Sequence, residues 1–83
     1  MPNLRRVLVV DDEENIRLVL QTLLAKKGYE VRTAVHAEEA LRLAAESAPD
    51  FVLTDVRMPG MSGTELCREL RSRWPQICVI MMS

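Results

Sequence analysis

The sequence predicts an α/β protein built on a parallel sheet, with the element order βαβαβαβ. Short apolar runs at residues 7–10, 51–53 and 77–82 are typical of strands that are buried on both faces. Segments with helical periodicity lie between the strands, and each of them ends near a glycine or a proline. Strands that alternate with helices indicate a parallel sheet with right-handed crossover connections.

The first half of the chain predicts a strand, a helix and a second strand. Residues 7–10 form the first strand, and Gly28 is the expected stop of the helix that follows. The apolar residues of this helix fall at positions i, i+3, i+4, i+7 and i+8, which predicts one inward stripe of Ile16, Val19, Leu20, Leu23 and Leu24. Residues 29–34 alternate weakly and are expected to form a strand nearer an edge of the sheet.

The second half continues the alternation. An alanine-rich helix is expected over about residues 37–47, followed by the strand at 51–53 and a loop at 58–61. Ser62 and Glu65 fit a capping box, which predicts the start of a third helix that stops before Pro75. The apolar faces of these two helices are expected to be Ala40, Leu41, Ala44 and Ala45, and then Leu66, Cys67, Leu70 and Trp74.

Length and composition favour one small domain covering residues 1–83, with 48% apolar and 28% charged residues. The net charge of −1 gives no broad basic field for nucleic acid or an anionic membrane. No apolar run approaches the roughly 20 residues that span a bilayer. Cys67 and Cys78 are isolated, so we expect free thiols in a reducing cytoplasm, and a disulfide only if the fold brings them together.

Three carboxylates follow two of the predicted strands. Asp11 and Asp12 come directly after the first strand, and Asp55 follows the third, which is expected to end at Thr54. In parallel α/β sheets, ligands bind beyond the carboxyl ends of the strands. If the first and third strands are neighbours, these side chains converge.

Carboxylates held this close repel one another unless a cation lies among them, and Mg²⁺ with oxygen ligands suits the group best. Such a site favours phosphoryl transfer, in which a carboxylate can itself be the nucleophile. The alternative is structural, because acidic residues stabilise the start of a helix and Asp is a common turn former.

Three segments resemble the receiver domain of bacterial two-component response regulators: VLVVDDEE (7–14), LTDVRMPGMSG (53–63) and VIMMS (79–83). The resemblance runs from residue 6 to residue 83. It implies a flavodoxin-like (CheY-like) three-layer fold, an α/β fold with the strand order 2-1-3-4 over the four strands present. That order places the first and third strands side by side.

The resemblance also implies roles for individual residues. Asp55 resembles the aspartate that accepts a phosphoryl group from a sensor histidine kinase. Asp12 and Asp55 resemble direct Mg²⁺ ligands, Asp11 a ligand through water, and Arg57 the residue whose backbone carbonyl binds the metal. Ser83 matches the switch hydroxyl that turns toward the phosphoryl group.

The family continues beyond this point with a helix, a fifth strand that ends in a lysine, and a last helix. We therefore expect a receiver truncated after its fourth strand, with its output domain absent. Lys26 and Lys27 lie at the far end of a helix and cannot replace that lysine. The fourth strand becomes an apolar edge, which predicts a homo-oligomer through this strand.

The expected role is regulatory and not enzymatic: a Mg²⁺-dependent phospho-acceptor that controls an output, with transcription as the expected one. One alternative is an aspartyl-phosphate hydrolase, although such enzymes usually carry an acid–base Asp at the position of Arg57. The other is an inert or engineered half-domain, silent without the lysine.

Overall fold

The computed structural model describes residues 5–82 and contains seven elements in the predicted order. They are β1 (Arg6–Val10), α1 (Glu14–Lys26), β2 (Glu30–Ala34), α2 (Ala37–Glu46), β3 (Phe51–Asp55), α3 (Gly63–Arg73) and β4 (Cys78–Met82). Each strand boundary lies within two residues of its predicted position. None of the helices in this described range is long and apolar enough to cross a bilayer.

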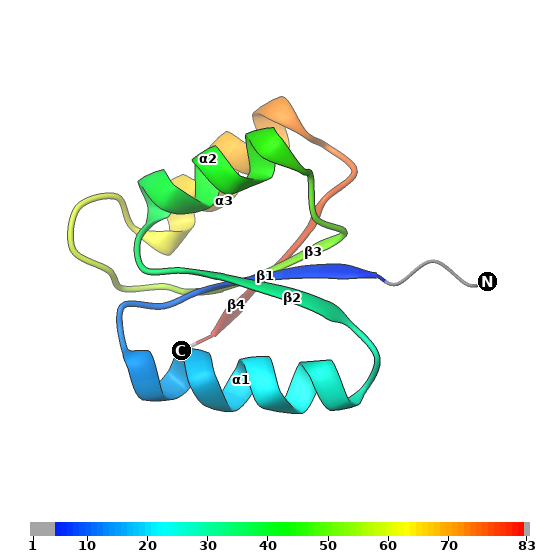
Figure 1. Cartoon of the computed structure of the whole chain (residues 1–83). Helices are drawn as coiled ribbons and strands as arrows, with labels where there is room; N and C mark the ends of the chain where they lie inside the picture. The colour runs from blue at the N-terminus through cyan, green and yellow to red at the C-terminus, as the bar shows by residue number, and fades with distance from the viewer. Residues whose placement is uncertain (1–4, 83) are drawn as a thin grey trace.

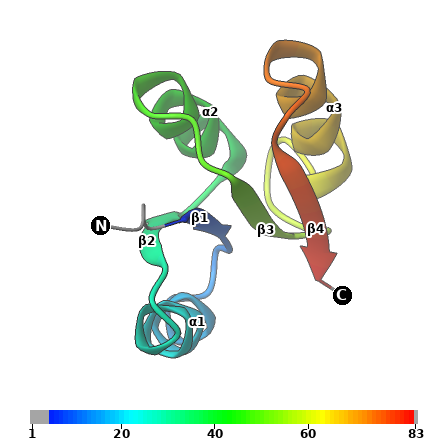
Figure 2. The same cartoon turned by 90° about the vertical axis from the view of Figure 1, so that its right-hand side faces the viewer.

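The four strands form one parallel sheet in the order β2-β1-β3-β4. Helices α2 and α3 cover one face of the sheet and α1 lies on the other, as Figures 1 and 2 show from two sides. The three-layer α/β fold and the strand order 2-1-3-4 are therefore confirmed. Because β1 and β3 are neighbours, their carboxyl ends lie side by side.

The core lies between the sheet and the α2–α3 layer. Small side chains on α2 let this helix approach the strands closely, while α3 contributes larger ones. The fully buried members of this core include Leu8, Val10 and Val52 from the strands, Ala40 and Ala44 from α2, and Leu66 and Leu70 from α3. Of the remaining predicted helix-face residues, Leu41, Cys67 and Trp74 are half-buried, and the prediction was wrong for Ala45, which is exposed.

Helix α1 departs from its predicted burial, because none of its residues is fully buried. The three half-buried positions are Arg17, Leu20 and Leu24. The predicted inward stripe is wrong for Ile16, Val19 and Leu23, which are 39%, 56% and 54% exposed. The reason is that α1 packs against β1 and β2, at one side of the sheet (Figure 2), so part of its apolar stripe extends past the strands it covers.

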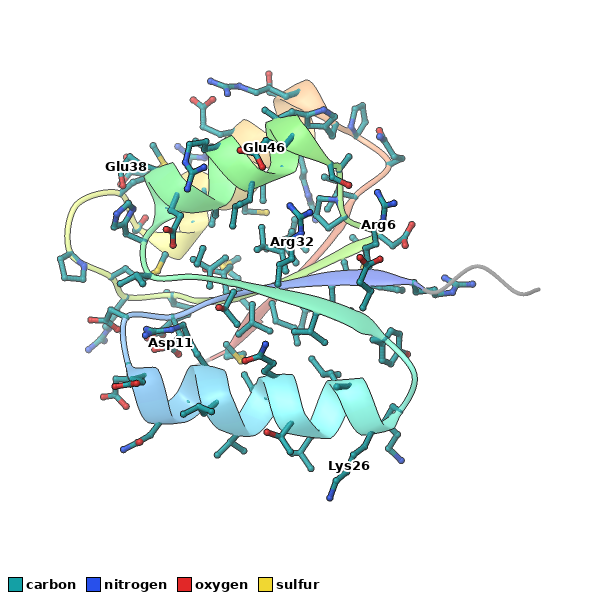
Figure 3. All side chains as sticks on the ribbon, in the orientation of Figure 1. Arg6, Asp11, Lys26, Arg32, Glu38 and Glu46 are labelled. Carbon is teal, nitrogen blue, oxygen red and sulfur yellow. The ribbon has the colours of Figure 1, made fainter. Side chains whose placement is uncertain are left out.

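The two edges of the sheet differ in chemistry. On β2, Glu30 and Arg32 form ion pairs with Arg6 and Glu46 at 3.4 and 3.9 Å. Figure 3 shows Arg6, Arg32 and Glu46 on the side of the sheet that α2 covers. The outer strand β4 contains no charged residue. Its Ile80 and Met81 are 45% and 44% exposed, which gives the apolar edge that the sequence predicts.

Candidate metal centre

The candidate site is formed where β1 and β3 end. Asp11 follows β1 directly, Asp12 is the next residue, and Asp55 is the last residue of β3, one position inside the strand instead of after it. One carboxylate oxygen from each of these residues lies within 4.8 Å of the others. The structure therefore brings together the three carboxylates that the sequence grouped.

Asp11 is the most firmly held of the three and is 5% exposed. Its N–H donates to the carbonyl oxygen of Ala34 at 3.1 Å, one residue past the end of the β1–β2 ladder. Its side-chain Oδ1 accepts from the Glu13 N–H at 2.9 Å, and its carbonyl oxygen accepts from Arg17 Nη1 at 2.7 Å. These three bonds fix the turn that carries Asp12 into the site.

Asp55 is half-buried, and both its backbone and its side chain accept hydrogen bonds. Thr54 Oγ1 donates to the carbonyl oxygen of Asp55 at 3.0 Å, and the Arg57 N–H donates to its side-chain Oδ1 at 3.3 Å. Gly63, the first residue of α3, lies so close that a Cβ atom there would be 2.1 Å from the Asp55 carbonyl oxygen. The start of α3 therefore rests directly on the backbone of Asp55.

The start of α3 is itself fixed by the predicted capping box. Ser62 Oγ accepts from the Glu65 N–H at 3.2 Å, and Glu65 Oε1 accepts from the Ser62 N–H at 3.3 Å. The Gly63 N–H also donates to the carbonyl oxygen of Val56 at 2.9 Å. These bonds close the loop between β3 and α3 at both of its ends, next to Asp55.

The other residues predicted for the site lie as follows. Arg57 is exposed in the loop after Asp55, and the metal-binding role of its carbonyl stays a prediction. Ser83 lies outside the described residues. Lys26 is at the opposite end of α1 from Asp11 (Figure 3). This confirms the prediction that Lys26 and its neighbour Lys27 lie far from the three carboxylates.

Two residues that contact the site were missed by sequence reasoning. Gly63 was seen only as part of the capping box, although a glycine directly after an N-cap residue is a weak sign of close packing. Arg17 on α1 is not among the residues that the sequence singles out. A signal for it exists, because it lies three and seven positions before Leu20 and Leu24 on one helix face.

The electrostatics of the cluster favour a cation. None of the ion pairs formed among residues 5–82 involves Asp11, Asp12 or Asp55. Two like charges 4 Å apart repel by about 4 kcal/mol at an effective dielectric constant of about 20. A hard divalent ion with oxygen ligands relieves this repulsion, and a Mg²⁺ ion fits one or two carboxylates plus several waters. Asp12 is exposed, so water can complete such a shell.

A groove of about 540 Å³ reaches the cluster from the α1 side of the sheet. It is lined by Glu13, Ile16, Val19, Leu20, Asp55 and Met82. Asp55 is therefore accessible to a reactant, and one wall of its approach is apolar.

Comparison with known proteins gives the family. The family model described as the response regulator receiver domain matches residues 7–83. The Regulatory protein AtoC of Escherichia coli K12 is 42% identical over 83 residues, which are 100% of this chain and 18% of AtoC. The alkaline phosphatase synthesis transcriptional regulatory protein PhoP of Bacillus subtilis is 40% identical over 79 residues, 95% of this chain and 33% of PhoP. The chain thus spans a third or less of these curated relatives.

Solved structures agree with the fold. The response regulator TrrA of Thermotoga maritima, crystallised with Mg²⁺-BeF, has a TM-score of 0.89 and 42% identity, covering 94% of this chain and 68% of TrrA. TrrA in complex with the histidine kinase ThkA gives a TM-score of 0.88, 42% identity and coverages of 94% and 67%. Together with the family match over residues 7–83, this means that the chain belongs to the response regulator receiver domain family.

Proposed function

We propose that residues 1–83 form a receiver module in which Asp55 accepts a phosphoryl group from a sensor histidine kinase. In this proposal Asp12 and Asp55 would hold Mg²⁺ directly, Asp11 would hold it through water, and Arg57 would offer its backbone carbonyl. The observation that carries the proposal is the meeting of three carboxylates within 4.8 Å at the ends of neighbouring strands. The structures of TrrA with Mg²⁺-BeF and with a histidine kinase support it.

The proposed chemistry is an in-line transfer to a carboxylate. An oxygen of Asp55 attacks the phosphorus atom of a phosphohistidine while the P–N bond breaks, and the imidazole nitrogen keeps the electron pair and takes up a proton. The contacts of Gly63 and Thr54 with the Asp55 backbone hold the nucleophile in place. A bound Mg²⁺ would neutralise the charge of the phosphoryl oxygens.

The test is phosphorylation by a small donor. After incubation with acetyl phosphate and Mg²⁺, the intact mass is expected to rise by one phosphoryl group, and Asp55→Asn is expected to abolish the gain. Asp50→Asn is the matched control, because Asp50 precedes the same strand at its other end and binds the Arg6 N–H. Ser83→Ala is expected to keep the gain, because the proposed switch hydroxyl is not the acceptor.

The same experiment, together with a beryllofluoride binding assay, separates the alternatives. A phosphorylated form that accumulates supports a regulatory, non-enzymatic role. Continuous release of phosphate without accumulation would point to a hydrolase, despite Arg57 at the acid–base position. If neither mass gain nor beryllofluoride binding occurs, the chain is an inert fragment.

We further propose that the module regulates an output domain outside this chain, in the cytoplasm, without binding nucleic acid or membrane itself. The name of PhoP, a transcriptional regulatory protein, supports transcription as the output. The net charge of −1 and the free thiols of Cys67 and Cys78 fit this assignment. Binding of the 83-residue chain to DNA at physiological salt would contradict it.

Finally, we propose that the 83-residue chain self-associates through β4. Cys78 N and Met82 O are bonded toward β3, so the N–H and C=O groups of Val79 and Met81 point outward by the alternation of a strand. An uncharged edge with free backbone groups can pair with its own copy about a two-fold axis. Size-exclusion chromatography with light scattering tests this, and a monomer at all concentrations would refute it.

A further inference from the structure

Helix α1 places a charged residue where its burial is greatest. All residues of α1 are exposed except Arg17, Leu20 and Leu24, which together form the face turned toward the sheet. The two leucines serve packing, as expected for such a face. An arginine there gives up hydration, so a polar contact is needed to explain it.

That contact leads to the metal centre. Arg17 Nη1 donates to the backbone carbonyl oxygen of Asp11 at 2.7 Å, in a partly buried position. This is the short distance of a charge-assisted hydrogen bond. The ion pairs formed among residues 5–82 do not include Arg17. Its guanidinium is therefore engaged with the backbone of the site and not with a carboxylate.

We propose that Arg17 is a positioning residue for the metal centre, an inference that rests on the function proposed above. The carbonyl it binds belongs to the peptide that joins Asp11 to Asp12. Since a peptide group is planar, holding its oxygen fixes the orientation of the whole unit and hence the direction from which the Asp12 side chain leaves the backbone. Two further bonds hold Asp11 itself: its N–H donates to the Ala34 carbonyl oxygen, and its Oδ1 accepts from the Glu13 N–H.

The direction in which Mg²⁺ affinity changes when Arg17 is removed separates a positioning role from a purely electrostatic one. A guanidinium near three carboxylates competes with a cation, so if Arg17 acted only through its charge, removing it would tighten Mg²⁺ binding. If it positions Asp12, removing it loosens the turn and weakens Mg²⁺ binding. Loss of a group that orients metal ligands typically costs about 10- to 100-fold in affinity.

The experiment is titration calorimetry with Mg²⁺ alone on the 83-residue chain. Arg17→Met keeps a long, helix-favouring side chain and is expected to raise the Mg²⁺ dissociation constant at least about tenfold. Arg17→Lys keeps a donor and is expected to recover most of the affinity. Arg71→Met, an equal loss of charge at an exposed position on α3, is expected to leave the affinity unchanged within about twofold.

A second readout needs no metal. Hydrogen exchange of the Glu13 amide, which donates to Asp11 Oδ1, is expected to be faster in Arg17→Met and to return toward wild type in Arg17→Lys. Should Arg17→Met fail to fold by circular dichroism, Arg17→Gln, which stays polar but is shorter, replaces it with the same expectation.

Three results would overturn the proposal. The first is that Arg17→Met binds Mg²⁺ as tightly as the wild-type chain or more tightly. The second is that Arg17→Lys binds Mg²⁺ no better than Arg17→Met. The third is that Arg71→Met loses as much Mg²⁺ affinity as Arg17→Met. Failure of the wild-type chain to bind Mg²⁺ is a different result, because it removes the proposed function and this inference with it.

Discussion

At the scale of single residues, Gly63 links the start of α3 to the proposed nucleophile. A methyl group at this position would lie 2.1 Å from the Asp55 carbonyl oxygen, so Gly63→Ala must displace the backbone of one or the other. We expect a loss of about 3 kcal/mol in the free energy of unfolding, at the upper end of the cost of overpacking. Urea unfolding at fixed protein concentration measures this, and Mg²⁺ titration is expected to show weaker binding.

Gly28→Ala provides the control for this substitution. Gly28 has φ +95°, and no atom lies within 4 Å of the point that an added methyl group would occupy. Alanine there costs about 1 kcal/mol of backbone strain without a clash. Its Mg²⁺ affinity is expected to stay at the wild-type value. If Gly63→Ala were as mild as Gly28→Ala, the close approach of α3 to Asp55 would not constrain the site.

The sequence allows the acidic residues of the site to be predicted but not their supports. Asp11, Asp12 and Asp55 stand out because each follows an apolar run, and that pattern is local. Gly63 matters because of its distance from the Asp55 backbone, and its position after an N-cap residue is only a weak local sign of that close approach. Arginine is usually a surface residue, so its residue type alone does not place Arg17 at the site. Its bond to the Asp11 carbonyl depends on how α1 is rotated about its own axis against the sheet.

At the scale of elements, the capping box of α3 couples helix stability to the loop after Asp55. Ser62→Ala removes the oxygen that accepts from the Glu65 N–H, and we expect a loss of about 1 kcal/mol in the free energy of unfolding. Ser72→Ala is the matched control, since Ser72 is exposed inside the same helix and alanine there favours the helix by a few tenths, up to about 0.5 kcal/mol.

Opposite signs for these two serine substitutions are therefore the expected outcome of urea unfolding. Equal effects would mean that the hydroxyl of Ser62 acts through general helix propensity and not as a cap. The comparison needs both proteins at one concentration, because self-association would add to the apparent stability.

Helix α1 shows where element-level prediction ends. Periodicity predicts that an amphipathic helix has an apolar side, and residues 14–26 do form that helix. Periodicity does not say which part of the apolar side meets the sheet. The structure turns Arg17, Leu20 and Leu24 inward and leaves Ile16 and Val19 lining the groove beside Asp55 and Met82. The predicted inward face was more accurate for α2, where Ala40 and Ala44 are buried and only Ala45 of that face is exposed.

At the scale of the whole molecule, the alternation of elements predicts a parallel sheet, but strand order depends on pairings far apart in the sequence. The family resemblance supplied the order 2-1-3-4, which the structure confirms. The order in turn decides which strands are edges. Charges occupy one of them, β2, through Glu30 and Arg32, and β4 has none. Natural sheets use such charges to prevent edge pairing.

The contrast between the two edges predicts that a charge on β4 would block self-association. Ile80 lies at the middle of β4 and is 45% exposed, so Ile80→Lys places a charge at the centre of a β4–β4 pair, once from each copy. If each of the two lysines buried at the interface costs about 1.4 kcal/mol of association free energy, the dissociation constant of the dimer rises about a hundredfold. Light scattering over a concentration series measures the shift. Val35→Lys is the control, because Val35 is 43% exposed and follows β2 at the opposite edge. If Val35→Lys dissociates the dimer equally, or Ile80→Lys leaves it intact, the copies meet elsewhere, and the uncharged β4 edge is not the surface that joins them.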